Sequence, residues 1–313
     1  MAFELPRNPR ASIAIPLYLR YTTIRYKRRL IRMNIGIRLH DVAGSSVEER
    51  LQIAQSQGFT CAHVALSKTI PGFSMKNADA LIDDALAEKL RTQHAKHNIQ
   101  CAVLGCYLNP ATPDEEEWEN NLKCYKAHLR LAAALGAKVV GTETGAPNTA
   151  YKTCPECWTE ESLQLFIRRI TPIVRYAEEV GAIIAIEPVC RHIVNTAERA
   201  QRVLETVDSP SLKIILDAVN LLDPSNQAYA DDVIQDALHR LGDQTLVMHM
   251  KDYLVVDGAA DLKATACGTG MMRYDSLLRF AKAHPDIPMT LENTNPSNAE
   301  AARLHLEKLA QSL

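Results

Sequence analysis

Short apolar segments alternate with longer amphipathic segments along the chain from residue 33 onward. A short run of β-branched and other apolar residues between turn residues is typical of a strand buried on both faces. A longer segment with apolar residues three and four positions apart is typical of a helix that packs along one face. The predicted strands cover residues 34–39, 61–66, 100–106, 138–142, 182–187, 213–217, 245–250 and 287–292. The predicted helices cover residues 46–56, 78–96, 114–134, 160–179, 196–206, 227–240, 275–283 and 298–312.

The residues that flank the helical segments support these boundaries. A Ser or Thr followed three residues later by Glu can cap a helix start, because each side chain satisfies a free N–H group of the other residue. This spacing occurs at Ser46 and Glu49, at Thr112 and Glu115, and at Ser297 and Glu300. Residues that readily adopt the left-handed conformation of a helix end follow the predicted helices at Gly58, Asn98, Gly136, Gly181 and Gly242. These signals predict separate helices, each joined to a strand on either side.

Eight strand–helix units in alternation predict an α/β fold, a (β/α)8 TIM barrel that forms a single domain over residues 34–313. The competing fold is a doubly wound open sheet, which would require a glycine-rich phosphate loop after the first strand. The chain has Leu39-His40-Asp41-Val42 at that position. The barrel is therefore the favoured fold.

Residues 1–33 differ from the rest of the chain in charge. They contain eight Lys and Arg residues against Glu4 alone, a net charge of +7, and because the whole chain nets −2, the remainder carries −9. We interpret residues 1–33 as a basic N-terminal extension outside the fold. Met33 directly precedes the first predicted strand, and we favour it as the natural start over the alternative of a transit peptide.

The remaining composition limits the class of protein. With 47% hydrophobic and 23% charged residues, the chain has the composition of a soluble globular protein. Its net negative charge argues against nucleic acid as a partner, and no stretch approaches the roughly 18 apolar residues of a membrane span. Eight cysteines without a secretion signal predict reduced thiols and a cytoplasmic location. Cys154-Pro155-Glu156-Cys157 has a metal or redox spacing, but without a second pair we interpret it as a loop that contains two cysteines.

Four consecutive predicted strands end in a side chain that can bind a metal ion, and these side chains are Glu187, Asp217, His249 and Glu292. We expect them to converge, because the carboxyl ends of barrel strands meet at one mouth. Three carboxylates close together repel one another unless a cation lies between them. The sequence therefore predicts a metal site. An oxygen-rich set of ligands with one imidazole suits Mn²⁺ best, with Mg²⁺, Co²⁺ and Zn²⁺ as alternatives.

This set of ligands predicts proton-transfer chemistry. A sugar C–H group beside a carbonyl is a weak acid, and a divalent ion that holds the neighbouring oxygens stabilises the enediolate that forms when the proton leaves. Two carboxylates on either side of the substrate can take the proton and return it to another carbon or another face. Glu187 and Glu292 are the candidates. The predicted protein is a divalent-metal-dependent isomerase or epimerase of a sugar or sugar-like hydroxy-ketone, acting through a metal-bound enediolate.

The strand ends also carry a family resemblance. The segments concerned are Glu187-Pro188-Val189-Cys190-Arg191, Asp217-Ala218-Val219-Asn220, His249-Met250-Lys251-Asp252 and Cys267-Gly268-Thr269-Gly270. In this order they resemble the xylose-isomerase-like sugar phosphate isomerase/epimerase superfamily over the whole chain from Met33. The resemblance implies a TIM barrel, one divalent metal on the four strand-end residues, and two glutamates that double as acid and base. It also implies that Arg191 and Lys251 contact substrate oxygens.

Two departures from the family's sequence pattern leave the identity of the substrate undetermined. Ketohexose epimerases of this superfamily usually carry a carboxylate where this chain has Ile193 and a histidine where it has Asn220. We include Asn220 among the expected substrate contacts. One alternative function is a dehydratase, a lyase that acts on a cyclic polyol ketone at the same metal. A second alternative is a non-catalytic barrel that binds a sugar. A homo-oligomer is compatible with the sequence, and no residue selects an interface.

Several further residues are weaker candidates for the mouth. Tyr107 and Asn109 follow the third predicted strand, and Glu143 follows the fourth, so we include them as candidate substrate contacts. His63 follows the second strand, where a histidine that is satisfied within its loop is the favoured interpretation. Residues 268–270 are either a phosphate-binding turn or a simple tight loop.

Overall fold

The computed structural model describes Met1 and residues 33–313. The predicted basic extension, residues 1–33, lies almost entirely outside the described residues. Eight parallel strands form a closed barrel in the order β1-β10-β7-β6-β5-β4-β3-β2, which confirms the predicted TIM barrel. The barrel strands are β1 (Ile35–Arg38), β2 (Cys61–Val64), β3 (Gln100–Gly105), β4 (Val139–Glu143), β5 (Ile184–Glu187), β6 (Leu212–Asp217), β7 (Thr245–Met250) and β10 (Met289–Leu291).

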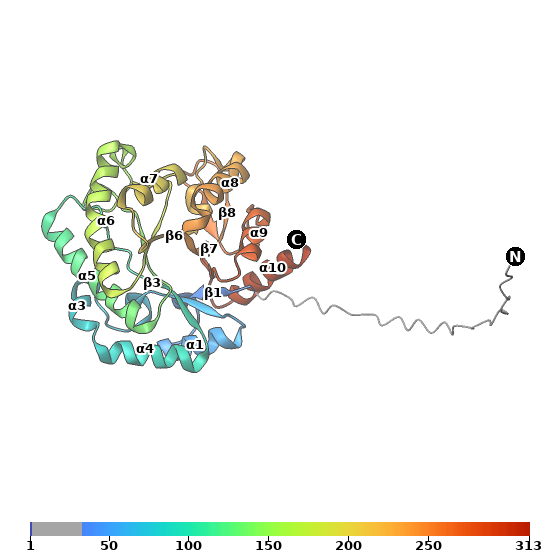
Figure 1. Ribbon diagram of the computed structural model, residues 1–313, viewed down its shortest axis with the longest axis horizontal. Coiled ribbons are helices and arrows are strands. Elements are labelled where there is room, and N and C mark those ends of the chain that lie inside the picture. The colour runs from blue at the N-terminus through green and yellow to red at the C-terminus, as the bar shows by residue number, and fades with distance from the viewer. Residues whose placement is uncertain (2–32) are drawn as a thin grey trace. The chain divides into compact units, whose positions relative to one another are not determined.

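Helices surround the strands on the outside of the barrel, as Figure 1 shows. The helices are α1 (Val47–Ser56), α2 (Leu66–Thr69), α3 (Ala78–Leu81), α4 (Asp84–His97), α5 (Glu115–Leu135), α6 (Glu160–Val180), α7 (Ala197–Val207), α8 (Ala230–Leu241), α9 (Asp275–Ala283) and α10 (Ala299–Ser312). None of the described helices is long and apolar enough to cross a membrane.

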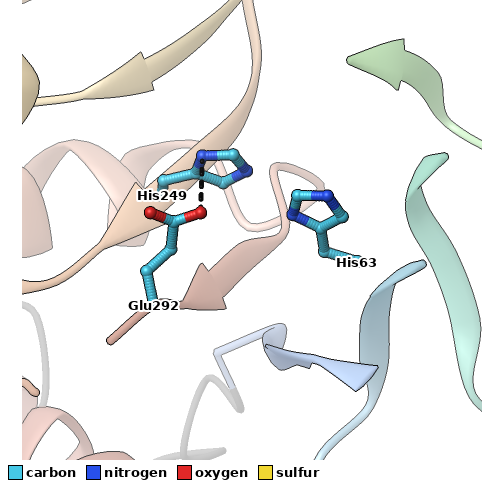
Figure 2. A group of neighbouring side chains, drawn as sticks. All are labelled: His63, His249 and Glu292. Atoms are coloured by element: carbon cyan, nitrogen blue, oxygen red, sulfur yellow. Dashed lines mark ion pairs between the residues drawn. The ribbon is translucent and has the colours of Figure 1, made fainter. Parts of the chain in front are cut away.

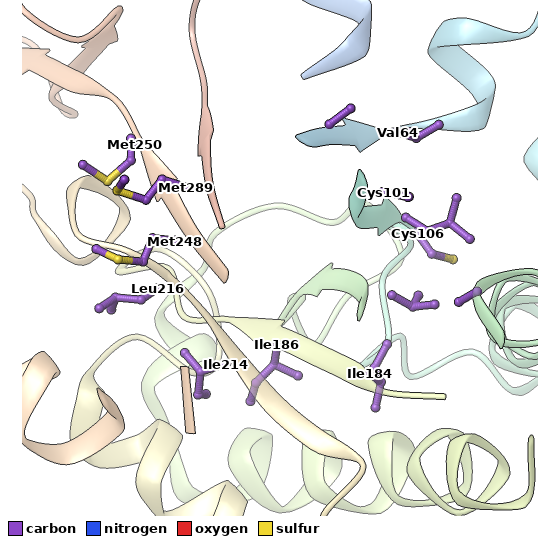
Figure 3. Close-up of a cluster of buried hydrophobic side chains, with 14 of the residues drawn as sticks. Val64, Cys101, Cys106, Ile184, Ile186, Ile214, Leu216, Met248, Met250 and Met289 are labelled. Atoms are coloured by element: carbon purple, nitrogen blue, oxygen red, sulfur yellow. The ribbon is translucent and has the colours of Figure 1, made fainter. Parts of the chain in front are cut away.

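The barrel strands are mostly buried, and the residues of six of them are divided between two different cores. The outward side chains of β5 and β7, such as Ile184, Ile186 and Met248, pack between the strands and the helices (Figure 3). A smaller cluster fills the barrel interior, and its buried members are Cys61, Ala102, Val103, Val139, Ala185, Ile215 and Val247. Alanine, cysteine and β-branched side chains together fill this space, which the inward-facing residues of the strands share. The two-residue period also sets which residues face the mouth.

The structure corrects some predicted helix starts. Helix α5 begins at Glu115 with Asp114 as its cap, because the Asp114 carboxylate accepts from the N–H of Glu117 at 2.7 Å. The hydroxyl of Thr112 instead donates to the Glu117 carboxylate. Helix α10 begins at Ala299, and no side chain caps it. At Ser46 the predicted cap is present, since its hydroxyl accepts from the N–H of Glu49.

An antiparallel hairpin that was not predicted follows the seventh barrel strand. It pairs β8 (Asp252–Leu254) with β9 (Lys263–Thr265). The connection between β7 and α9 is therefore a structured excursion beyond the barrel, and it carries residues to the rim of the mouth. Its strands of three residues are too short for a periodic pattern to identify them from the sequence.

Candidate functional site

The four predicted metal ligands lie together at the mouth of the barrel. Glu187, Asp217, His249 and Glu292 close β5, β6, β7 and β10, and one donor atom from each lies within 4.8 Å of the others. All four residues are buried. They converge because each faces inward and lies within one position of the end of its strand. The Cα atoms of Asp217 and His249 are direct partners in the barrel register.

His249 lies between the two glutamates. Its Nδ1 atom is 3.1 Å from Oε2 of Glu187 and 3.4 Å from Oε1 of Glu292. Burial alone would lower the pKa of His249, but the two carboxylates raise it to about 9. The carboxylates therefore favour the cationic imidazolium, which balances part of the negative charge around it; a metal ion bound at this ring would replace its extra proton.

Lys251 supplies a second positive charge inside the cluster. Its ammonium nitrogen lies 2.9 Å from Oδ2 of Asp217 and 3.3 Å from Oε2 of Glu292. The ammonium also donates to the side-chain oxygen of Asn220 at 2.7 Å, and the Asn220 amide donates to Glu187 at 2.6 Å. Burial alone would lower the pKa of Lys251, yet the carboxylates raise it overall, so the side chain stays charged. Lys251 and Asn220 thus join the three carboxylates into one network.

Two of the three acidic residues of this network, Asp217 and Glu292, respond differently to their surroundings. Burial raises the pKa of Asp217 to about 6, although Lys251 opposes the shift. Burial would also raise the pKa of Glu292, but His249, Lys251 and Arg38 lower it well below its usual range. The Arg38 guanidinium lies 3.9 Å from Glu292, which places a residue from the first barrel strand beside the last. The sequence analysis missed Arg38, although its inward position at the end of the first predicted strand could have identified it.

His63 is the main residue that the sequence analysis assigned wrongly. Neither of its ring nitrogens has a hydrogen-bond partner among residues 33–313, although the residue is buried. Its ring stacks on that of His249 with centroids 5.3 Å apart, and Figure 2 shows it facing His249 and Glu292 across the mouth. Burial lowers the pKa of His63 well below its usual value, so the ring is neutral. His63 lies in β2 and is not bonded within a loop, so it presents free nitrogens to the mouth.

Tyr107 and Glu143 reach the mouth from the strands opposite β10. The Tyr107 hydroxyl is buried without a partner among the described residues, and its ring lies 5.5 Å from that of His63. Glu143 accepts a hydrogen bond from the Tyr151 hydroxyl at 3.3 Å, and burial together with the charge of Glu187 raises its pKa to about 7. Both side chains therefore lie near the buried cluster, and they stay candidate substrate contacts.

Asn109 and Arg191 lie elsewhere. The Asn109 amide donates to the carbonyls of residues 146 and 148, and its oxygen accepts from the N–H groups of residues 111 and 146. Asn109 therefore holds two loops together, and we leave it out of the proposed substrate contacts. Arg191 is half exposed at the rim, where it pairs with Asp261 of the hairpin loop at 2.9 Å. It is not part of the buried cluster.

The turn at residues 268–270 is a tight loop closed by Asp252. The N–H groups of Gly268 and Gly270 donate to one carboxylate oxygen of Asp252 at 3.1 and 2.9 Å. The N–H of Met272 donates to the other oxygen at 2.7 Å. Because a carboxylate of the chain itself already binds these groups, the turn does not offer them to a phosphate.

The donor set fits a divalent cation. Three carboxylates and one imidazole converge in a buried site, and Nε2 of His249 has no hydrogen-bond partner among the described residues. Hard oxygen ligands with an imidazole suit Mn²⁺, Mg²⁺ or Zn²⁺. Such a set can hold a cation and still leave glutamate oxygens available to move protons.

Comparisons with known proteins agree with this architecture. A family model described as a xylose isomerase-like TIM barrel matches residues 51–311. A sequence comparison with curated proteins finds no match.

Three solved structures with similar folds cover most of the chain. A 3-keto-D-glucoside 4-epimerase from E. coli is 17% identical with a TM-score of 0.65, over 90% of this chain and 98% of its own. The probable 3-DHS dehydratase of petrobactin synthesis from Bacillus anthracis is 14% identical with a TM-score of 0.66, over 89% and 98%. A xylose isomerase-like TIM barrel protein from Mycobacterium smegmatis in complex with magnesium is 17% identical with a TM-score of 0.65, over 90% and 97%. These likenesses establish the fold.

Proposed function

Because the chain belongs to the xylose isomerase-like TIM barrel family, we propose that it is a divalent-metal-dependent isomerase or epimerase of a sugar or sugar-like hydroxy-ketone. One observation carries the proposal. Two buried glutamates from β5 and β10 lie within 4.8 Å of an aspartate and a histidine that complete a metal-binding set. A barrel that only binds a sugar has no need of two such carboxylates beside its ligand.

Glu187, Asp217, His249 and Glu292 would hold the cation. When bound, it supplies Lewis-acid polarisation of the carbonyl and hydroxyl oxygens of the substrate. We place Mn²⁺ first because of the oxygen-rich ligands, and the magnesium complex of a protein with the same fold supports a hard divalent ion.

The two glutamates would perform the proton transfer. One removes a proton from the carbon next to the carbonyl, and the other returns a proton to the neighbouring carbon or to the opposite face. Glu187 accepts from Asn220 at 2.6 Å, which fixes its Oε1 atom and leaves Oε2 toward His249. The burial of both glutamates keeps bulk water away from the reacting carbon.

Other mouth residues would bind the substrate oxygens. The Lys251 ammonium carries the positive charge that an oxygen gaining negative charge requires. Tyr107 and His63 offer polar atoms without partners among the described residues, so a hydroxyl group of the substrate would satisfy them. All eight cysteines are free thiols, which fits the reducing cytoplasm that we propose as the location.

A dehydratase is the second candidate. It begins with the same proton removal and then expels a hydroxyl group. The likeness to the probable 3-DHS dehydratase covers 89% of the chain, against 90% for the likeness to the epimerase. The product distinguishes the two reactions, since only the dehydratase product has lost water.

Deuterium incorporation tests the proposal. The protein is incubated with Mg²⁺ in D₂O and a panel of ketoses, ketose phosphates and cyclic polyol ketones, and the C–H signals are followed by NMR. We expect deuterium at the carbon beside the carbonyl of one compound class with the natural protein. Glu187→Gln and Glu292→Gln should both abolish it, because each removes a carboxylate that would both transfer protons and hold the cation.

Glu88→Gln is the matched control, since Glu88 is exposed and pairs with Arg91 on the outer surface of α4. This variant should exchange at the natural rate. If none of the compounds exchanges although the protein binds the metal ion, the assignment of the glutamates as acid and base is wrong.

A further inference from the structure

A pair of thiols lies in the loop between β4 and α6, outside the metal-binding cluster. Cys154 directly precedes a single turn of 3-10 helix, Pro155–Trp158, and Cys157 lies within that turn; their sulfur atoms are 3.8 Å apart. The N–H of Cys157 donates to the carbonyl of Cys154 at 3.0 Å, which closes the turn and places both side chains on one side of it. A disulfide requires sulfurs about 2.05 Å apart, so a small side-chain rotation closes the gap.

The two thiols differ in their access to solvent. Cys154 is partly exposed and lies between the exposed residues Thr153 and Pro155, whereas Cys157 is buried. Burial also raises the pKa of Cys157. The Asn148 amide donates to the sulfur of Cys154 at 3.4 Å and holds it near its partner. A reagent in solution therefore meets Cys154 first.

The other cysteines of the chain offer no comparable pair. Cys61, Cys101, Cys106, Cys124 and Cys267 are buried. Cys190 is partly exposed, but its thiol donates to the carbonyl of Leu222 at 3.3 Å. No group of metal-binding side chains among residues 33–313 includes Cys154 or Cys157, which argues against a zinc site there.

We propose that Cys154 and Cys157 form a reversible disulfide by exchange with a low-molecular-weight disulfide. The Cys154 thiolate attacks one sulfur of the small disulfide, forms a mixed disulfide and releases one small thiol. The Cys157 thiolate then attacks the Cys154 sulfur, forms the internal disulfide and releases the second small thiol. Two protein thiols are oxidised, one small disulfide is reduced to two thiols, and a small thiol in excess reverses both steps. The inference is independent of the metal chemistry proposed above.

The pair is connected to the rim of the mouth. Trp158 directly follows Cys157, and its indole N–H donates to the carbonyl of Cys190 in the loop after Glu187 at 3.3 Å. The same loop between β4 and α6 carries Tyr151 to Glu143. Oxidation therefore occurs in a segment that contacts the loop after β5 and the last residue of β4 at the mouth.

Glutathione disulfide is the probe for the test. The reduced full-length protein is incubated with it, free thiols are blocked by alkylation, and the peptides are identified by mass spectrometry. We expect a Cys154–Cys157 disulfide without retained glutathione, and its loss on treatment with a dithiol. In Cys157→Ser the reaction should stop at a glutathione adduct on Cys154. In Cys154→Ser residue 157 should stay unmodified, because its thiol is buried.

Circular dichroism of both variants checks that they are folded. Two results would overturn the proposal. The first is a glutathione adduct on Cys154 of the natural protein that persists while Cys157 remains a free thiol. The second is a Cys154 that reacts no faster than Cys190 in the same sample.

Discussion

The charge balance of the mouth predicts an unusual response to the loss of Lys251. Its ammonium is 6% exposed and lies 2.9 Å from Asp217 and 3.3 Å from Glu292. Lys251→Met keeps most of the side-chain volume but leaves the three carboxylates with His249 as their nearest cation. Removing one partner of a buried ion pair typically costs about 3–5 kcal/mol, because the other charge stays buried without compensation.

Protonation limits the size of this loss. A carboxyl group with an ordinary pKa near 4 can take up a proton at pH 7 at a cost of about 4 kcal/mol, so the loss does not greatly exceed that value. At roughly 2–4 °C per kcal/mol for a domain of this size, Lys251→Met should lower the melting temperature without metal by roughly 10 °C. Differential scanning calorimetry in the presence of a chelator measures this loss.

Mn²⁺ should then stabilise the variant more than the natural protein. In the natural protein a cation held by these carboxylates would be repelled by the Lys251 ammonium, whereas in the variant it would replace the missing charge. We expect Mn²⁺ to bind the variant at least about tenfold more tightly, which adds about 1.4 kcal/mol of stabilisation at saturating metal.

Lys213→Met is the matched control. Lys213 lies near the start of β6 and donates to the neutral Gln244 side chain at 2.6 Å. Its loss should leave the response to Mn²⁺ unchanged. If Mn²⁺ raises the melting temperature of Lys251→Met by no more than that of the natural protein, Lys251 does not share its carboxylates with the metal, and the reasoning fails.

Three further predictions concern the site, the pH dependence and the barrel interior. Asp217→Asn removes one charged ligand, so titration calorimetry should show that Mn²⁺ binds about 10- to 100-fold more weakly. Circular dichroism should show that the variant is folded, and an unchanged affinity would exclude Asp217 as a ligand. Burial lowers the pKa of His128 to about 4, so below pH 6.5 the unfolded state binds more protons than the folded state. The free energy of unfolding therefore falls as the pH drops from about 6.5 to 4, by up to about 3 kcal/mol. His128→Asn should flatten this part of the urea-midpoint profile, and an unchanged slope would contradict the assignment. A Cβ atom on Gly36 would clash with the backbone oxygen of Cys61. Gly36→Ala should therefore lower the free energy of unfolding, measured by urea titration, by about 1–3 kcal/mol or more. A variant as stable as the natural protein would show that β1 and β2 can separate locally.

The residues at the strand ends could be predicted because their positions depend on local pattern. A strand alternates its side chains between two faces, so an apolar run that ends in Glu187 or Asp217 already determines that the acid faces the same side as Ala185 or Ile215. The strict alternation of strands and helices then determines a parallel sheet. The C-terminal ends of its strands lie at one edge, so the acidic side chains lie there together. The family resemblance rested on the same segments.

Contacts between distant strands depended on the closure of the barrel. Closure pairs β1 with β10, and this places Arg38 beside Glu292, at the other end of the sequence. It also left His63 without hydrogen-bond partners among the described residues, which no local signal could distinguish from a histidine bonded within its loop.

The sequence by itself determined the barrel, the order of its strands and helices, and the four acidic and imidazole side chains at its mouth, because these follow from two- and four-residue periods. Only the tertiary structure decided that Lys251 pairs with two of the carboxylates, that Asn109 hydrogen-bonds the neighbouring loop, and that Asp252 closes the turn after the hairpin. The physical reason is that a hydrogen bond or ion pair requires two groups within about 3 Å of each other. Periodicity assigns a side chain to a face of its strand, whereas the curvature of the closed sheet and the course of the loops set the remaining distance.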